Sequence, residues 1–175
     1  MQIDGMNAKV LFDEDTIANR IKELGAQITA DFSPEPIVVV GVLKGAFIFL
    51  ADLIRAIDLP LHVEFIGVAS YAGTQSTGHV RLTHDLAAEI VGKNVLLVED
   101  VIDSGRTIDY LLDVLSVRGP QKLAVASFFS KPELHKMNNR IDYVGFEISK
   151  EFVIGYGLDL DQKYRNLPYV AQIIE

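Results

Sequence analysis

The alternation of short apolar runs with helical patterns is the feature that most constrains the fold of this chain. Residues 37–42 form an unbroken apolar run of strand length, which is typical of a strand covered on both faces of a parallel sheet. Further strands are predicted at residues 61–68, 94–98 and 123–129, with shorter extended pieces at 79–82, 143–146, 152–154 and 169–173. Strands that alternate with helices predict an α/β fold, in which a central, mainly parallel sheet is flanked by helices.

The predicted helices each have one apolar face. In residues 13–31 the apolar positions recur at helical spacing: Ile17, Ile21, Leu24 and Ile28. A second helix is expected from residue 44, with these side chains inward: Phe47, Leu50, Ile54 and Ile57. A third is expected over residues 106–117, with these on one face: Ile108, Leu111, Leu112 and Leu115.

Composition excludes several classes of protein. The chain has 175 residues, which suits one domain with a real core, and it has no Cys for a disulfide or a thiolate metal site. Its net charge of −8, without a basic cluster, argues against nucleic acid as a partner. No apolar run is long enough to cross a membrane. The first residues lack the basic flank and apolar core of a secretory signal, which favours a cytoplasmic location.

Ligand chemistry gathers in residues 95–108, VLLVEDVIDSGRTI. An apolar strand ends in the carboxylates of Glu99 and Asp100, and a turn of small residues then leads into a helix. Free N–H groups at such a turn suit a phosphate, while the carboxylates suit sugar hydroxyls or a magnesium ion. Asp103 or Ser104 could also be a plain helix cap, but a cap does not explain the two acids before it. The pattern predicts a phosphorylated sugar as the substrate.

Two further polar segments, residues 43–45 and Lys131, follow predicted strands. Because ligands of parallel sheets bind at the carboxyl ends of the strands, all three segments are expected to converge there. Neither phosphate-binding motif of nucleotide-binding folds is present: G-x-x-x-x-G-K-[ST] and G-x-G-x-x-G.

Residues 99–107 resemble the phosphoribosyl pyrophosphate signature of the phosphoribosyltransferases. Nearly the whole chain resembles the bacterial hypoxanthine-guanine branch of that family, with matching stretches in the same order at residues 41–45, 70–71, 130–132, 152–159 and 164–169. The resemblance implies the type I phosphoribosyltransferase fold in one domain, 1–175. It also implies a small hood subdomain from the chain termini, made by the N-terminal segment and about 131–175, and a mobile lid loop at about 69–79.

The resemblance also implies the site residues. The ribose and 5-phosphate would be bound by Glu99, Asp100, Asp103, Ser104, Gly105, Arg106 and Thr107, with Asp103 as the catalytic proton handler at purine N7. Pyrophosphate would be bound by Leu43, Lys44, Gly45, Ser70, Tyr71 and Arg165, with a cis peptide bond between residues 43 and 44. The purine would be bound by Lys131, Phe152, Val153 and Asp159. Mg2+ would be held by Glu99, Asp100 and Asp159.

The implied reaction transfers the 5-phosphoribosyl group from phosphoribosyl pyrophosphate to hypoxanthine or guanine, giving IMP or GMP and pyrophosphate in purine salvage. The resemblance also implies a homodimer or homotetramer. Two alternatives remain at this point: a xanthine-preferring enzyme and a non-catalytic nucleotide-sensing regulator. Adenine is disfavoured, because Lys131 would face an amino donor. From the residues alone, a position such as Phe152 is more often a core side chain, Lys44 could equally be a surface residue, and Asp159 and Arg165 are of types that usually lie on the solvated surface.

Overall fold

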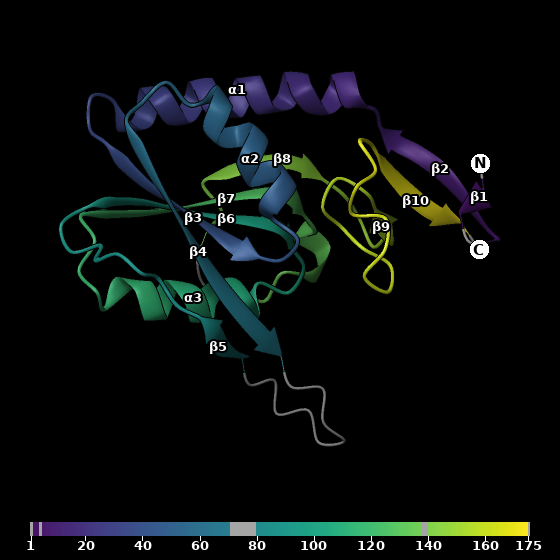
Figure 1. Cartoon of the computed structure of the whole chain (residues 1–175). Helices are drawn as coiled ribbons and strands as arrows, with labels where there is room; N and C mark the ends of the chain where they lie inside the picture. Colours follow the sequence, from purple (N-terminus) through teal and green to yellow (C-terminus); the bar gives the residue numbers. More distant parts are fainter. Residues whose placement is uncertain (1, 4, 71–79, 138–139, 175) are drawn as a thin grey trace.

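The computed structural model describes residues 2–3, 5–70, 80–137 and 140–174, and the strands of these residues form two sheets (Figure 1). From edge to edge, the main sheet contains β5 (Val80–His84), β4 (Leu61–Ser70), β3 (Ile37–Leu43), β6 (Asn94–Ile102), β7 (Lys122–Ser130) and β8 (Tyr143–Glu147). The five strands β4, β3, β6, β7 and β8 pair parallel with one another in that order. The edge strand β5 pairs antiparallel with β4. The predicted mainly parallel sheet is confirmed.

Helices cover both faces of the main sheet, as an α/β fold requires. α1 (Glu14–Phe32) and α2 (Phe47–Ala56) lie on one face, and α3 (Arg106–Ser116) lies on the other (Figure 1). The central strand β3 is buried from Ile37 to Val42, because odd and even positions pack into the cores on opposite faces. α1 begins where its acidic start predicts, since the Asp13 side chain accepts a hydrogen bond from the Thr16 N–H (2.9 Å) and caps the helix.

The prediction for the second helix was wrong at its start. Residues 44–46 form a turn, and α2 begins at Phe47, whose side chain is 41% exposed rather than inward. The helix packs through Phe49, Leu50 and Leu53. Leu50 is therefore inward as predicted, and so are Ile54, which is partly buried against the core, and Ile57, which is buried at the end of the helix. Its first residue lies at the end of the sheet, where Phe47 has no core to pack against.

Strand β6 is longer than predicted. It continues past residue 98 to Ile102, so Glu99 and Asp100 lie inside the strand rather than after it. Its ladder with β7 runs on through these positions, with Glu99 opposite Ser127 and Ile102 opposite Ser130. Backbone pairing therefore fixes both carboxylates in the sheet.

The second, smaller sheet is antiparallel and joins the two ends of the chain, which confirms the expected hood (Figure 1). Its strands are, in order, β1 (Gln2–Ile3), β2 (Met6–Phe12), β10 (Val170–Ile174) and β9 (Val153–Ile154). The strands β1 and β2 were not predicted. β8 lies within residues 131–175 but belongs to the main sheet. The one-domain assignment and the lid remain predictions, and residues 71–79 lie outside the described part of the chain.

Aromatic side chains join the two sheets. The Phe12 ring of β2 lies 4.2 Å from that of Phe146 and 5.5 Å from that of Phe129, measured between centroids. Tyr156, which follows β9, packs on Phe128 at 4.8 Å, and its hydroxyl donates to the Asp52 carboxylate of α2 (2.5 Å). In the described ranges, no helix combines the length and the hydropathy that a membrane span requires.

Candidate functional site

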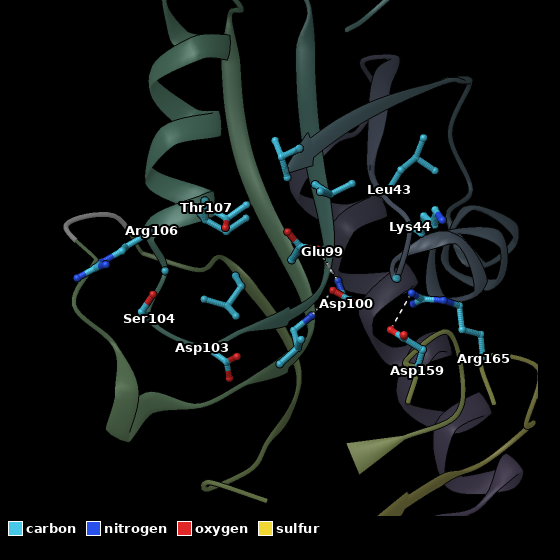
Figure 2. A pocket seen from close by; sticks show the side chains of 17 residues that line it. Leu43, Lys44, Glu99, Asp100, Asp103, Ser104, Arg106, Thr107, Asp159 and Arg165 are labelled. Carbon is cyan, nitrogen blue, oxygen red and sulfur yellow. Dashed lines mark hydrogen bonds and ion pairs between the residues drawn. The ribbon is translucent and has the colours of Figure 1, made fainter. Parts of the chain in front are cut away.

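A cavity of about 380 Å³ lies at the carboxyl ends of β3 and β6. Four parts of the chain that are distant in sequence line it: residues 42–45, Val68 of β4, residues 99–108, and Asp159 with Arg165. Figure 2 shows Glu99 and Asp100 between the turn that carries Ser104 and Thr107 on one side and Lys44, Asp159 and Arg165 on the other. The predicted convergence of polar segments is therefore present for the 43–45 and 99–107 segments.

The two carboxylates at the centre of the cavity crowd each other. Glu99 is 7% exposed, and burial, together with the adjacent Asp100 carboxylate, raises the pKa of Glu99 well above its usual range. Asp100 in turn packs against Gly45, where a Cβ would overlap its carboxylate, so only glycine allows this approach of the 43–45 loop. Such a pair favours a cation or sugar hydroxyls as a partner.

Residues 103–107 line the cavity and lead into the first turn of α3. Gly105 is the N-cap of α3, with φ +81°, and no side chain caps this end of the helix. The interpretation of Asp103 or Ser104 as a plain helix cap is therefore wrong. The first N–H groups of a helix have no partner within it, so this end can accept an anion.

Asp103 points to a neighbour outside the turn. Its carboxylate lies 3.1 Å from Lys131 Nζ, and the Lys131 side chain is only 14% exposed. The Lys131 N–H also donates to the Ile102 carbonyl (3.0 Å), which fixes the start of the segment after β7 beside the turn. Lys131 adjoins the cavity without lining it.

The opposite side of the cavity is built by the 43–45 loop and the turn after β9. The peptide bond between Leu43 and Lys44 is cis, as the resemblance implies. Arg165 donates to the Gly157 carbonyl (2.7 Å) and pairs with Asp159 (2.7 Å). Lys44 Nζ lies 3.5 Å from the Gln162 side-chain oxygen.

Four further predicted residues lie outside the lining of the cavity or at the border of the described residues. Phe152 is 51% exposed, so the alternative of a core side chain is wrong, whereas Val153 is buried. The Phe152 carbonyl accepts from the Ile173 N–H (3.0 Å), which ties it to β10. Ser70 is the last residue of β4, and Tyr71 lies outside the described residues.

The donor set fits a magnesium ion only in part. Within the described ranges, no group of three or more His, Asp or Glu residues could hold a metal. Mg2+ usually takes one or two protein carboxylates and completes its shell with water and substrate phosphates, which Glu99 and Asp100 allow. Both Asp159 oxygens already have partners, Arg165 and the Gln162 N–H (2.8 Å).

Two residues near the site were missed from the sequence. Gln162 contacts both Lys44 and Asp159, and Met137 packs against Gly105. Neither belongs to a recognisable motif, and the contacts of Gln162 with Lys44 and of Met137 with Gly105 join positions that are distant in sequence. Only the folded backbone brings them together.

Comparisons with known proteins agree with this geometry. Residues 7–161 match the model of the phosphoribosyl transferase domain. The hypoxanthine phosphoribosyltransferase of Haemophilus influenzae is 44% identical over 169 residues, 94% of each chain. The bifunctional protein TilS/HprT of Listeria innocua is 45% identical over 164 residues, but the match spans only 25% of its length and 93% of this chain. The crystal structure of a hypoxanthine-guanine phosphoribosyltransferase from Bacillus anthracis has a TM-score of 0.92 at 44% identity, and the match covers 97% of this chain and 99% of that one.

Proposed function

Because the chain belongs to the phosphoribosyltransferase family, we propose that it transfers the 5-phosphoribosyl group of phosphoribosyl pyrophosphate to a 6-oxopurine, hypoxanthine or guanine. The products are IMP or GMP and pyrophosphate, as in purine salvage. The names of the relatives favour this reaction over a xanthine-preferring enzyme or a non-catalytic regulator.

The observation that carries the proposal is the pair formed by Asp103 and Lys131, 3.1 Å apart beside the 103–107 turn. In the nucleotide of a 6-oxopurine, the C6 oxygen and N7 are neighbouring acceptors on one edge of the base. In the tautomer of the free base that reacts through N9, N7 carries a proton, so Lys131 donates to the C6 oxygen and the Asp103 carboxylate takes the proton from N7. Adenine would present an amino donor to Lys131 instead.

The remaining residues bind the 5-phosphate, the ribose and the purine. The N–H groups of the 103–107 turn, with the Ser104 and Thr107 hydroxyls, bind the 5-phosphate and so orient the reacting carbon from a distance. Glu99 and Asp100 accept from the ribose hydroxyls and place negative charge near the carbon that becomes positive. The half-exposed Phe152 stacks on the purine, and the Val153 main chain completes its recognition.

The pyrophosphate leaves towards the other side of the cavity. The 43–45 loop, the Lys44 ammonium and the Arg165 guanidinium bind the developing negative charge there. Glu99 and Asp100 would hold a Mg2+ ion, which would supply positive charge for the leaving group. Asp159 would take part in that site only by giving up one of its present partners, Arg165 or the Gln162 N–H. Ser70 and Tyr71 complete the pyrophosphate site.

One assay tests the proposal. The protein is incubated with phosphoribosyl pyrophosphate, Mg2+ and each of hypoxanthine, guanine, xanthine and adenine singly, and the nucleoside monophosphate and pyrophosphate are quantified. With hypoxanthine or guanine, we expect nucleoside monophosphate and pyrophosphate to form in equal amounts. Product with xanthine alone, or no product together with an RNA gel shift, would replace the proposal with one of the two alternatives.

Two properties of the whole protein are also proposed. We propose that it forms a homodimer or homotetramer and is cytoplasmic, with neither nucleic acid nor membrane as a partner. Sedimentation velocity on the purified protein gives the oligomeric state. Cell fractionation tests the location, and activity in the membrane pellet would contradict it.

A further inference from the structure

Residues 131–137, here called the backing segment, lie along the outer side of the 103–107 turn. The segment starts at Lys131, which is tied to Ile102 and Asp103 as described above. Farther along, the Lys136 N–H donates to the Ser104 carbonyl (2.9 Å). Successive residues of the turn are thus held from one side by a single short piece of chain.

The backing segment ends at Met137, which packs directly on Gly105. A Cβ added to Gly105 would overlap the Met137 side chain, so the two residues are in close contact. Met137 is partly buried and also packs against the core cluster that contains Ile102 and Ile108, the residues on either side of the turn. Its side chain therefore fills the space behind the glycine.

The hydrogen bonds from Lys131 and Lys136 hold the turn on either side of Asp103, whereas the contact with Met137 is made at Gly105 itself. Gly105 has φ +81° and caps α3 without any side-chain hydrogen bond. A glycine changes conformation readily, so the direction of the neighbouring N–H groups depends on what packs against it. We infer that Met137 is a positioning residue for the 5-phosphate: it holds the Gly105 backbone in the conformation that aims the N–H groups of the turn at the phosphate.

The segment also connects the two ends of the substrate. Hydrogen bonds within it, from the Leu134 N–H to the Lys131 carbonyl (2.9 Å) and from the His135 N–H to the Pro132 carbonyl (3.2 Å), make it compact. Its first residue meets the purine in the proposed function, on which this inference rests, and its last supports the phosphate turn. Met137 therefore tunes affinity for the phosphate end of the nucleotide.

The variant Met137→Ala tests the inference by separating the two ends of the ligand. We expect it to weaken binding of IMP, measured by calorimetry, by about fivefold or more, because the charge-assisted hydrogen bonds of the turn lose alignment. Binding of inosine, which lacks the 5-phosphate, should change less than about twofold. The KM for phosphoribosyl pyrophosphate should rise by a similar factor to the dissociation constant of IMP, while kcat at saturating substrate changes little.

Two matched variants and clear outcomes complete the experiment. Met137→Leu, of similar volume, should restore IMP affinity, and Glu133→Ala, at an exposed position of the same segment, should leave it unchanged. If Met137→Ala cannot be purified folded, Met137→Val takes its place with the same expected selectivity. Equal loss of IMP and inosine binding, or no loss of either, overturns the inference. A wild-type protein that makes no nucleotide overturns the proposed function as well, whereas an active wild type with an unaffected variant overturns this inference alone.

Discussion

Glu99 carries a carboxylate into the interior of a sheet, where acids are rare unless a partner compensates them. Burial, reinforced by Asp100, raises the pKa of Glu99, because both disfavour the charged form of the carboxyl group. The buried carboxylate thus destabilises the ligand-free protein, and a sugar hydroxyl or a cation removes this destabilisation. An unfolding experiment can detect it.

The first prediction concerns Glu99→Gln in the ligand-free protein. Because the pKa of Glu99 is higher in the folded than in the unfolded state, its contribution to stability is full below the unfolded pKa, about 4.3, and is lost as pH rises through the folded pKa. Glutamine lacks this loss. We expect the variant to exceed wild type in free energy of unfolding at neutral and alkaline pH, and the excess to shrink on acidification.

Urea unfolding over a series of pH values measures the difference. Glu89→Gln, which removes an exposed carboxylate before β6, is the matched control and should run parallel to wild type. Parallel curves for Glu99→Gln itself would show that the carboxylate is not destabilised by its surroundings. The same variant should bind phosphoribosyl pyrophosphate less tightly. The two measurements therefore separate the effect of the Glu99 carboxylate on stability from its effect on substrate binding.

The second prediction concerns Asp103→Asn. If Asp103 handles the proton at purine N7, an amide in its place removes general acid–base help, and kcat at saturating substrates should fall roughly 10²–10⁴-fold. IMP should still bind, because the N–H groups of the turn are unchanged. Asp113→Asn, on the exposed side of α3, alters the charge equally and should retain full activity. Wild-type kcat in Asp103→Asn would refute the assigned role.

Among the elements, α1 and α2 cross most closely at Gly25. A Cβ at this position would overlap the backbone carbonyl and the side chain of Ala56, at the end of α2. α2 is the helix that follows the 43–45 loop, so the depth of this crossing sets where that loop starts. The glycine is thus required by packing, although it weakens the helix that contains it.

The third prediction is that Gly25→Ala destabilises the protein although alanine is the better helix former. Alanine is favoured by about 1 kcal/mol in a helix interior, but overpacking costs about 1–3 kcal/mol, so we expect a net loss of up to about 2 kcal/mol in the free energy of unfolding. Ala26→Gly, at the exposed neighbouring position, measures the propensity difference alone. A gain in stability for Gly25→Ala would mean that the crossing relaxes freely.

The elements that the sequence predicted best are strands that are almost fully buried and helices with one buried face. β3 and β7 were predicted because their residues are almost all apolar, and α1 and α3 because one face of each is. β2 was missed because its strand is half exposed and mixes Lys9 with apolar residues. The end of β6 was missed because two acids interrupt the apolar pattern, and only pairing with β7 keeps them in the strand.

At the scale of the whole molecule, the site depends on how the small sheet meets the main one. The turn after β9, which carries Asp159 and Arg165, is anchored by Tyr156 through its hydrogen bond to Asp52. Burial and this acceptor raise the pKa of the Tyr156 phenol, so it stays a donor at physiological pH. The sequence predicted that the 43–45 and 99–107 segments would converge, but not these contacts between distant segments.

The fourth prediction is a double-mutant cycle across this junction. Tyr156→Phe, Asp52→Ala and the double variant should give a coupling free energy of about 1.5–3 kcal/mol in urea unfolding, as for a hydrogen bond to a charged group. Tyr156→Phe should also raise the KM for both substrates, because Asp159 and Arg165 lose their anchor. The Tyr143→Phe variant, whose hydroxyl donates to Asp31 far from the cavity, should lose stability without this kinetic effect. A coupling near zero would mean that aromatic packing alone joins the two sheets.

The pairing of β2 with β10 also bears on how the protein is made. Residues 6–12 meet their partner only when residues 170–174 have left the ribosome, after the main sheet has already been synthesised. Arg165 and the strand that anchors Phe152 emerge in the same late stretch. Until residues 170–174 are available, β2 and β9 lack their common partner, so the small sheet and the turn it carries beside the cavity cannot form.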